Sequence, residues 1–92
     1  MKIHLKAVGD LREYFGRAPQ EIELPDGASF KELMTVIGAR WGSQLPTHVW
    51  DAKKGQFGGA VYLVKEGHAV LDLGTALEDD SEIVVLRAIS GG

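Results

Sequence analysis

The strongest strand pattern in the chain is the heptapeptide Ile83-Val84-Val85-Leu86-Arg87-Ala88-Ile89, which is followed by Ser90-Gly91-Gly92. Its first four residues are all apolar, whereas a strand with one face in water alternates apolar and polar residues. Such an uninterrupted run is typical of a strand that is covered on both faces. We therefore predict that 83–89 lies in the interior of a sheet and that the last three residues leave it as a short tail.

Two alternating segments near the start of the chain predict a pair of half-buried strands. Residues 2–8 alternate polar and apolar side chains, and residues 20–24 repeat the pattern with Glu21 and Glu23 on the polar face. If the two segments pair antiparallel, these carboxylates share a solvent face with the basic side chains of the first segment. Residues 11–16, which lie between the segments, are expected to form one helical turn or a loop.

One amphipathic helix is expected after the turn Pro25-Asp26-Gly27-Ala28. Ser29 and Glu32 have the spacing of a capping box, so the helix should begin here, and Gly42 is a plausible stop. The apolar stripe of this helix consists of Phe30, Leu33, Met34 and Ile37.

The region 43–59 is the least regular part of the sequence and is longer than most connections without secondary structure. Its apolar side chains are Leu45, Val49, Trp50 and Phe57. Two interpretations stay open: these side chains close the open end of the core, or the region is a partner-docking loop.

A hairpin and an acidic turn complete the expected elements. Residues 60–64 are rich in β-branched and aromatic residues, and they are predicted to pair with a short return strand at 68–71 as a hairpin around 65–67. Glu78-Asp79-Asp80-Ser81 is expected to be a solvated turn rather than a cation site, because no second cluster of acidic ligands accompanies it.

The order of these elements predicts an α+β domain of two layers, a mixed sheet of four to five strands covered by one main helix. An interior last strand is most easily placed beside the first strand. We expect one domain over residues 1–89 and a flexible tail over 90–92.

Composition excludes several classes of function. The net charge of −3 gives no field suited to nucleic acid, and no apolar run approaches the roughly 18 residues of a membrane span. Cysteine is absent, which removes thiolate chemistry and cysteine-based metal sites, and the three histidines lie far apart in the sequence. These two observations predict no metal site. With no signal-peptide pattern at its start, the protein is expected to be cytoplasmic. No catalytic carboxylate pair, Ser-His arrangement or phosphate-binding glycine loop stands in a coherent context, so the chain is not expected to be an enzyme on its own.

The succession of these motifs resembles the ubiquitin-like β-grasp sulfur carriers of the MoaD/ThiS type, and within them most closely the small subunit of molybdopterin synthase. The likeness covers essentially the whole chain. It rests on Leu11-Arg12-Glu13 after the first strand, the turn at 25–27, the helix start at 29–33, the acidic turn into the last strand at 77–83, and the ending Ile89-Ser90-Gly91-Gly92.

The resemblance implies that the working group is the carboxylate of Gly92. A carboxylate is ionised at neutral pH and is a poor electrophile, so it must be activated before sulfur can be added. A ubiquitin-activating-type enzyme that uses ATP and magnesium would adenylate Gly92, and a persulfide or sulfide sulfur would then displace AMP to leave a thiocarboxylate. No cofactor is expected on the carrier itself. A larger synthase subunit, or another sulfur acceptor, would be the second partner.

Partner binding is expected from the tail and the end of the last strand, through Val85, Arg87, Ile89, Ser90 and Gly91. Glycine suits a narrow channel near a nucleotide, because it has no side chain and few backbone restrictions. The docking face is expected on the side of the sheet away from the helix. Alternation places Val85 and Arg87 on one face of the last strand, although the sequence leaves open which face meets the helix. Arg87 could pair with an acidic group of the partner.

Several functions remain open from the sequence. The first is a sulfur carrier for pterin cofactor synthesis. Within the same chemistry the acceptor could instead be thiamine, cysteine, a thiolated tRNA, or a lysine of another protein in ubiquitin-like conjugation. A non-catalytic β-grasp binding module, in which the Gly-Gly pair is incidental, is a third class.

Overall fold

The computed structural model describes residues 1–58, 60–65 and 76–87. Its elements, in chain order, are β1 (Lys2–Ala7), the 3-10 turn η1 (Gly9–Leu11), α1 (Arg12–Phe15), β2 (Gln20–Glu23), α2 (Phe30–Trp41), β3 (Trp50–Asp51), β4 (Gln56–Phe57), β5 (Val61–Lys65) and β6 (Ser81–Arg87). The predicted strand 68–71, the end of the last strand and the tail 90–92 lie outside the described residues.

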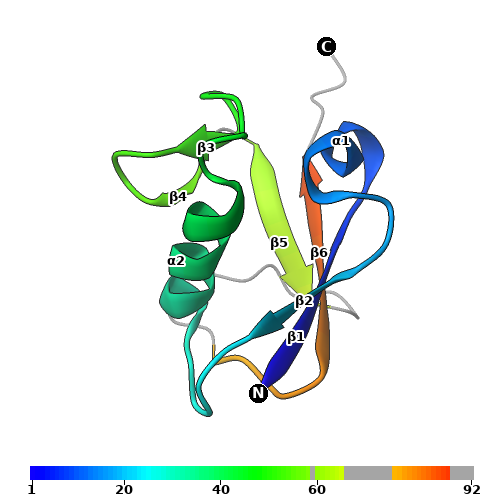
Figure 1. Cartoon of the computed structure of the whole chain (residues 1–92), viewed down its shortest axis with the longest axis vertical. Coiled ribbons are helices and arrows are strands. Elements are labelled where there is room, and N and C mark those ends of the chain that lie inside the picture. Colours follow the sequence, from blue (N-terminus) through cyan, green and yellow to red (C-terminus); the bar gives the residue numbers. More distant parts are fainter. Residues whose placement is uncertain (59, 66–75, 88–92) are drawn as a thin grey trace.

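The main sheet has the strand order β2-β1-β6-β5, with β6 in an interior position (Figure 1). β1 and β6 run parallel, with Leu5 opposite Ile83 and Ala7 opposite Val85, whereas β1–β2 and β5–β6 are antiparallel. The placement of the last strand beside the first and the antiparallel pairing of the first two strands are therefore confirmed. Across that antiparallel pair Lys2 Nζ lies 3.7 Å from Glu21 Oε2.

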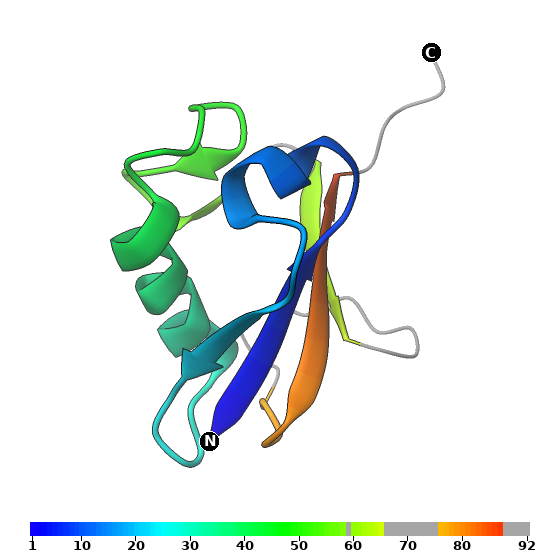
Figure 2. The same cartoon turned by 45° about the vertical axis from the view of Figure 1, so that its right-hand side comes forward.

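α2 packs on one face of the sheet, and Figure 2 shows the two layers side by side. β1 contributes Ile3, Leu5 and Ala7 to the core, while Leu33 and Ile37 of α2 are fully buried opposite them. Among the described residues no second helix covers the other face. The last strand was expected to be covered on both faces, and this is wrong for the face away from α2. Val84 and Leu86 point away from α2 and stay partly exposed.

The start of α2 agrees with the sequence in position but not in detail. Ser29 is the N-cap residue and α2 ends at Trp41, directly before Gly42, as predicted. The side chain of Ser29 makes no capping hydrogen bond, however. Its backbone carbonyl accepts from the amides of Glu32 (3.1 Å) and Leu33 (3.2 Å) instead, so the capping box does not form.

The region 43–57 closes the core on the side of α2. Leu45, Val49 and Trp50 are buried, which confirms the first of the two interpretations. The region also contains the short hairpin β3–β4, which was not expected from the sequence. Trp50 and Phe57 pair across this hairpin, with their rings in an edge-on arrangement at 5.0 Å.

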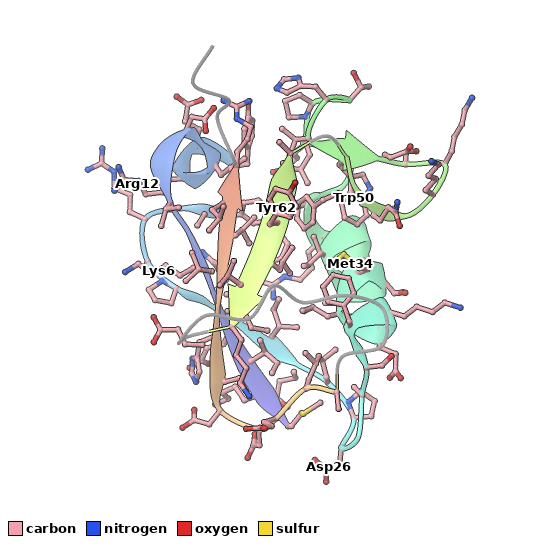
Figure 3. The ribbon with its side chains drawn as sticks, turned by 180° about the vertical axis from the view of Figure 1, so that it is seen from behind. Lys6, Arg12, Asp26, Met34, Trp50 and Tyr62 are labelled. Carbon is pink, nitrogen blue, oxygen red and sulfur yellow. The ribbon has the colours of Figure 1, made fainter. Side chains whose placement is uncertain are left out.

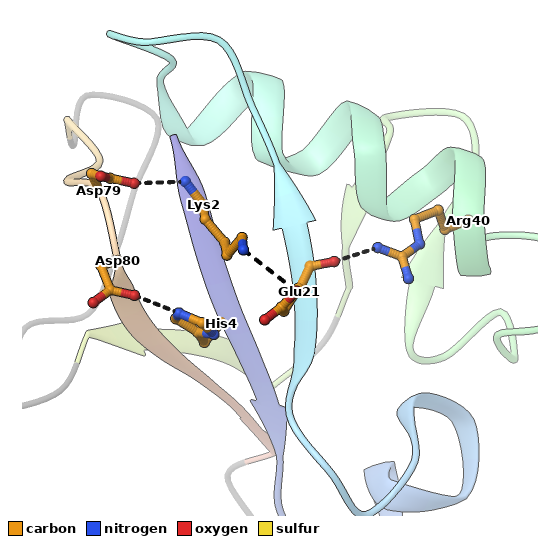
Figure 4. A network of polar contacts seen from close by, with 6 residues as sticks. All are labelled: Lys2, His4, Glu21, Arg40, Asp79 and Asp80. Carbon is orange, nitrogen blue, oxygen red and sulfur yellow. Dashed lines mark hydrogen bonds and ion pairs between the residues drawn. The ribbon is translucent and has the colours of Figure 1, made fainter.

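Hydrogen bonds connect the acidic turn at 78–81, where β6 begins, to the start of β1 (Figure 4). The backbone amide of Lys2 donates to Asp79 Oδ1 at 2.8 Å, and the amide of Asp80 donates to the Lys2 carbonyl at 2.7 Å. Asp80 has φ of 62°, and its carboxylate lies 2.6 Å from His4 Nε2. The turn is thus exposed, as predicted, but its carboxylates also fix the register between the first and last strands. None of the helices in the described part of the chain is long and apolar enough to cross a membrane.

Gly38 is required where α2 meets the hairpin. A Cβ at this position would lie 2.8 Å from Cζ2 of the Trp50 ring. Gly38→Ala should therefore lower the free energy of unfolding by about 1 kcal/mol, since overpacking of about 1–3 kcal/mol exceeds the gain in helix propensity of about 1 kcal/mol. Urea denaturation measures this, with Thr35→Ala on the exposed face of α2 as the control, which should not be destabilised. A Gly38→Ala protein more stable than the wild type would contradict this packing.

The hydrogen bond from the Lys2 amide holds the pKa of the Asp79 carboxyl below its ordinary value. A carboxyl with a lowered pKa in the folded state stabilises the fold above its unfolded pKa, and this contribution is lost as the pH falls through the folded pKa. Stability should therefore decrease below about pH 4, and Asp79→Asn should reduce that decrease. Urea midpoints measured from pH 6 to pH 2 test this, with the exposed Glu13→Gln as control. Equal acid slopes for wild type and Asp79→Asn would contradict it.

Candidate partner face and tail exit

The face of the sheet away from α2 carries an apolar patch near the end of β6. Leu86 lies opposite Tyr62, and Val84 lies opposite Val64, on the face of β5 and β6 that alternation directs away from the core. On the β1 side, the Val8 amide donates to the Val85 carbonyl at 3.2 Å, which brings Val8 alongside this end of β6. We call these residues the open-face patch: Val8, Tyr62, Val64, Val84 and Leu86.

Tyr62 and Val8 are the two most exposed large apolar residues in the described part of the chain, and both belong to the open-face patch. Tyr62 is 42% exposed and Val8 is 38% exposed. Figure 3 shows Tyr62 on β5 and Lys6 on β1 with their side chains. Lys6 lies opposite Val84, and His4 lies opposite Glu82, so charged groups border the patch further along the same face. Contiguous apolar surface with a polar border is typical of a site that binds another protein.

Val85 does not belong to this face, and its prediction as a partner-binding residue is wrong. Its side chain is 0% exposed and packs in the core with Ile83 and Leu63. Alternation along β6 then directs Val84 and Leu86 outward. The sequence offered no means to choose which face of this strand meets α2, because four consecutive apolar residues fit either face.

Arg87 stands at the end of β6, where its guanidinium forms an ion pair with Asp10 of η1. The loop after β1 and the end of β6 are thereby joined by a charge-assisted contact as well as by the Val8–Val85 hydrogen bond. Arg87 thus has an acidic neighbour within the chain, and its pairing with an acidic group of a partner protein stays a prediction. Ile89, Ser90, Gly91 and Gly92, the other predicted site residues, lie outside the described residues.

The described residues contain no cluster of metal-ligating side chains. No group of three or more His, Asp or Glu side chains in 1–58, 60–65 and 76–87 is arranged to hold a metal ion. His4 contacts Asp80 on the sheet, and His48 belongs to the connection after α2. The described residues do form an exposed apolar surface near the end of β6.

No protein-family model matches the sequence, and no curated protein does. Solved structures do match over nearly the whole chain. SAMP1 from Haloferax volcanii superposes with a TM-score of 0.77 at 17% identity, and each chain is covered completely. The fold is therefore the ubiquitin-like β-grasp.

Two further β-grasp structures are similar. A crystal structure of the small archaeal modifier protein 1 of H. volcanii matches with a TM-score of 0.73 at 19% identity, over 96% of this chain and 98% of the other. A protein from Pyrococcus furiosus assigned as molybdopterin converting factor, subunit 1, matches with a TM-score of 0.71 at 22% identity, over 97% and 99%. At these identities the β-grasp likeness establishes the architecture, and the predicted resemblance is confirmed at that level.

Substitutions on the two faces of β6 should differ in how much they lower the free energy of unfolding. Val85→Thr places a hydroxyl in the apolar core and should lower the free energy of unfolding by about 2 kcal/mol. Leu86→Thr puts a good strand former on a partly exposed position and should cost less than about 1 kcal/mol. Urea denaturation of the two single variants measures the difference. A larger loss for Leu86→Thr than for Val85→Thr would show that the assignment of the faces is reversed.

Proposed function

We propose that this β-grasp chain is a sulfur carrier whose working group is the α-carboxylate of Gly92. The observation that supports the proposal most strongly is the juxtaposition at the end of β6. An interior strand of a β-grasp sheet ends beside an exposed apolar patch and is followed in the sequence by a short segment ending in Ser90-Gly91-Gly92.

The dimensions suit a carrier that stays on the surface of its partner. Five residues follow Arg87, and an extended chain of that length spans at most about 17 Å. The open-face patch could rest on the partner while the last residues enter its active site. The Arg87–Asp10 ion pair would hold the point from which the tail departs, so the docked surface and the tail would keep a fixed relation.

The chemistry divides between carrier and partner. The activating enzyme would join the Gly92 carboxylate oxygen to the α-phosphorus of ATP and release pyrophosphate. Hydrosulfide would then attack the carbonyl carbon, forming a C–S bond and expelling AMP, so that the chain ends in a thiocarboxylate. The carrier contributes the acyl carbon, and the partner contributes the nucleotide, the magnesium ion and the catalytic groups.

The acceptor of the sulfur is proposed to be the pterin precursor of the molybdenum or tungsten cofactor, within a complex with a larger synthase subunit. The likeness to the P. furiosus molybdopterin converting factor subunit supports this choice. The likeness to small archaeal modifier protein 1 supports the second candidate, a ubiquitin-like modifier whose activated Gly92 is transferred to a lysine of another protein. Both functions use the same first step, activation of the terminal carboxylate.

Activation can be tested with an adenylating enzyme of the ubiquitin-activating type, by following ATP–pyrophosphate exchange. Deletion of Gly92, or addition of one alanine after it, should abolish exchange, because the carboxylate is then displaced from the reactive position. Leu86→Glu should raise the KM for the carrier about ten-fold or more by placing a charge in the docked patch. Thr35→Glu on α2 is the matched surface control and should leave exchange unchanged. Normal exchange by the chain with the added alanine would refute the proposal.

A further inference from the structure

A groove of about 730 Å³ lies between α2 and the β3–β4 hairpin, and no residue of the open-face patch lines it. Figure 3 labels Met34 of α2 and Trp50 of β3, both of which line it. Its apolar lining consists of Met34, Trp50 and Ala52, and the Trp50 ring lies beside Gly38. A volume of this size falls in the range of roughly 300–1,000 Å³ that is typical of small-molecule sites.

The hairpin wall of the groove is held by its own hydrogen bonds. Asp51 Oδ1 accepts from the amides of Lys53 (3.0 Å) and Lys54 (3.1 Å), and the Asp51 carbonyl accepts from the Gly55 amide at 2.8 Å. Gly55 has φ of 64°, a conformation that suits glycine. The opposite wall is the regular backbone of α2, and the Trp50 ring packs against it at Gly38. The shape of the groove is therefore built into the fold.

The charges at the groove have one sign. Lys31 on α2 and Lys54 on the hairpin are the charged side chains in its lining, one from each wall. Neither ammonium group lies within ion-pair distance of a carboxylate in the part of the chain that the structure describes. This is notable in a chain whose net charge is −3. Thr35, Ser43 and Gln56 add hydroxyl and amide groups to the lining, which can orient a polar substituent.

We propose that this groove binds a small planar organic anion, such as an aromatic carboxylate, sulfonate or phosphate ester. The apolar body of the ligand would contact Met34, Ala52 and Trp50. Its anionic group would lie between Lys31 and Lys54. The ligand site is independent of the proposed sulfur-carrier function, because the groove and the open-face patch have no residue in common.

The test is a titration of the full-length ¹⁵N-labelled chain with 1-naphthalenesulfonate, followed by NMR. The amides of Gly38, Gly42 and Gly55, which line the groove, should shift in a saturable manner, while those of Gly9 and Gly27 should not. Neutral 1-naphthalenemethanol, which has the same ring system, should bind at least about five-fold more weakly, as expected for the loss of one charge interaction.

Charge variants distinguish specific binding at the groove from non-specific attraction of the anion to positive charge. Lys54→Glu and Lys31→Glu should each weaken binding of 1-naphthalenesulfonate about five-fold or more. Lys53→Glu makes the same change of net charge one residue away, outside the groove lining, and should weaken binding less than two-fold. The proposal is overturned by equal binding of the neutral compound, by equal effects of Lys53→Glu and Lys54→Glu, by shifts centred on Tyr62 and Leu86, or by no saturable binding.

Discussion

The parallel pairing of β1 with β6 is the constraint on which the rest of the molecule depends. It brings the first and last described strands together and places β6 in the interior of the sheet. Parallel strands cannot be joined by a tight turn, so the intervening chain has room for the helix layer that buries the inner face. The bonds of Asp79 and Asp80 to Lys2 at one end, and the Arg87–Asp10 ion pair at the other, secure both ends of this pairing.

Much of this architecture could be read from local patterns because those patterns have simple physical causes. Alternation in 2–8 and 20–24 predicted the first two strands, and the apolar stripe after Ser29 predicted α2. The capping box failed, since residue types at the right spacing do not ensure that the side chains turn toward the backbone. The β3–β4 hairpin was missed because it rests on two residues per strand and on an Asp51–Gly55 turn rather than on a long periodic pattern.

The candidate site was predicted less completely than the fold. Its location at the last strand and the tail was inferred from residues 83–92. Most of the predicted site residues belong to the end of this stretch, which is not among the described residues. The assignment of Val85 to the partner face was wrong, since a run of apolar residues does not show which face meets α2. The open-face patch depends on Tyr62 and Val8, which lie on β5 and directly after β1, and only the pairing of the strands brings them to Leu86.

The molecule thus presents two surfaces with different chemistry. The open-face patch is apolar, lies on the sheet and stands at the end of β6, which suits a protein partner that must reach the end of the chain. The groove beside α2 is bordered by two lysines and suits a compact anion. Because the two surfaces have no residue in common, a small ligand and a large partner could be bound at once.

The proposed function depends on whether the carboxylate of Gly92 carries sulfur. The most direct measurement is the intact mass of the chain after its expression together with its adenylating enzyme and a sulfur source. We predict a species that ends at Gly92 in which one oxygen is replaced by sulfur, and its conversion to the unmodified carboxylate when a sulfur acceptor is supplied. A chain that ends at Gly92 and retains only oxygen after confirmed exposure to the active enzyme and sulfide would contradict the sulfur-carrier function.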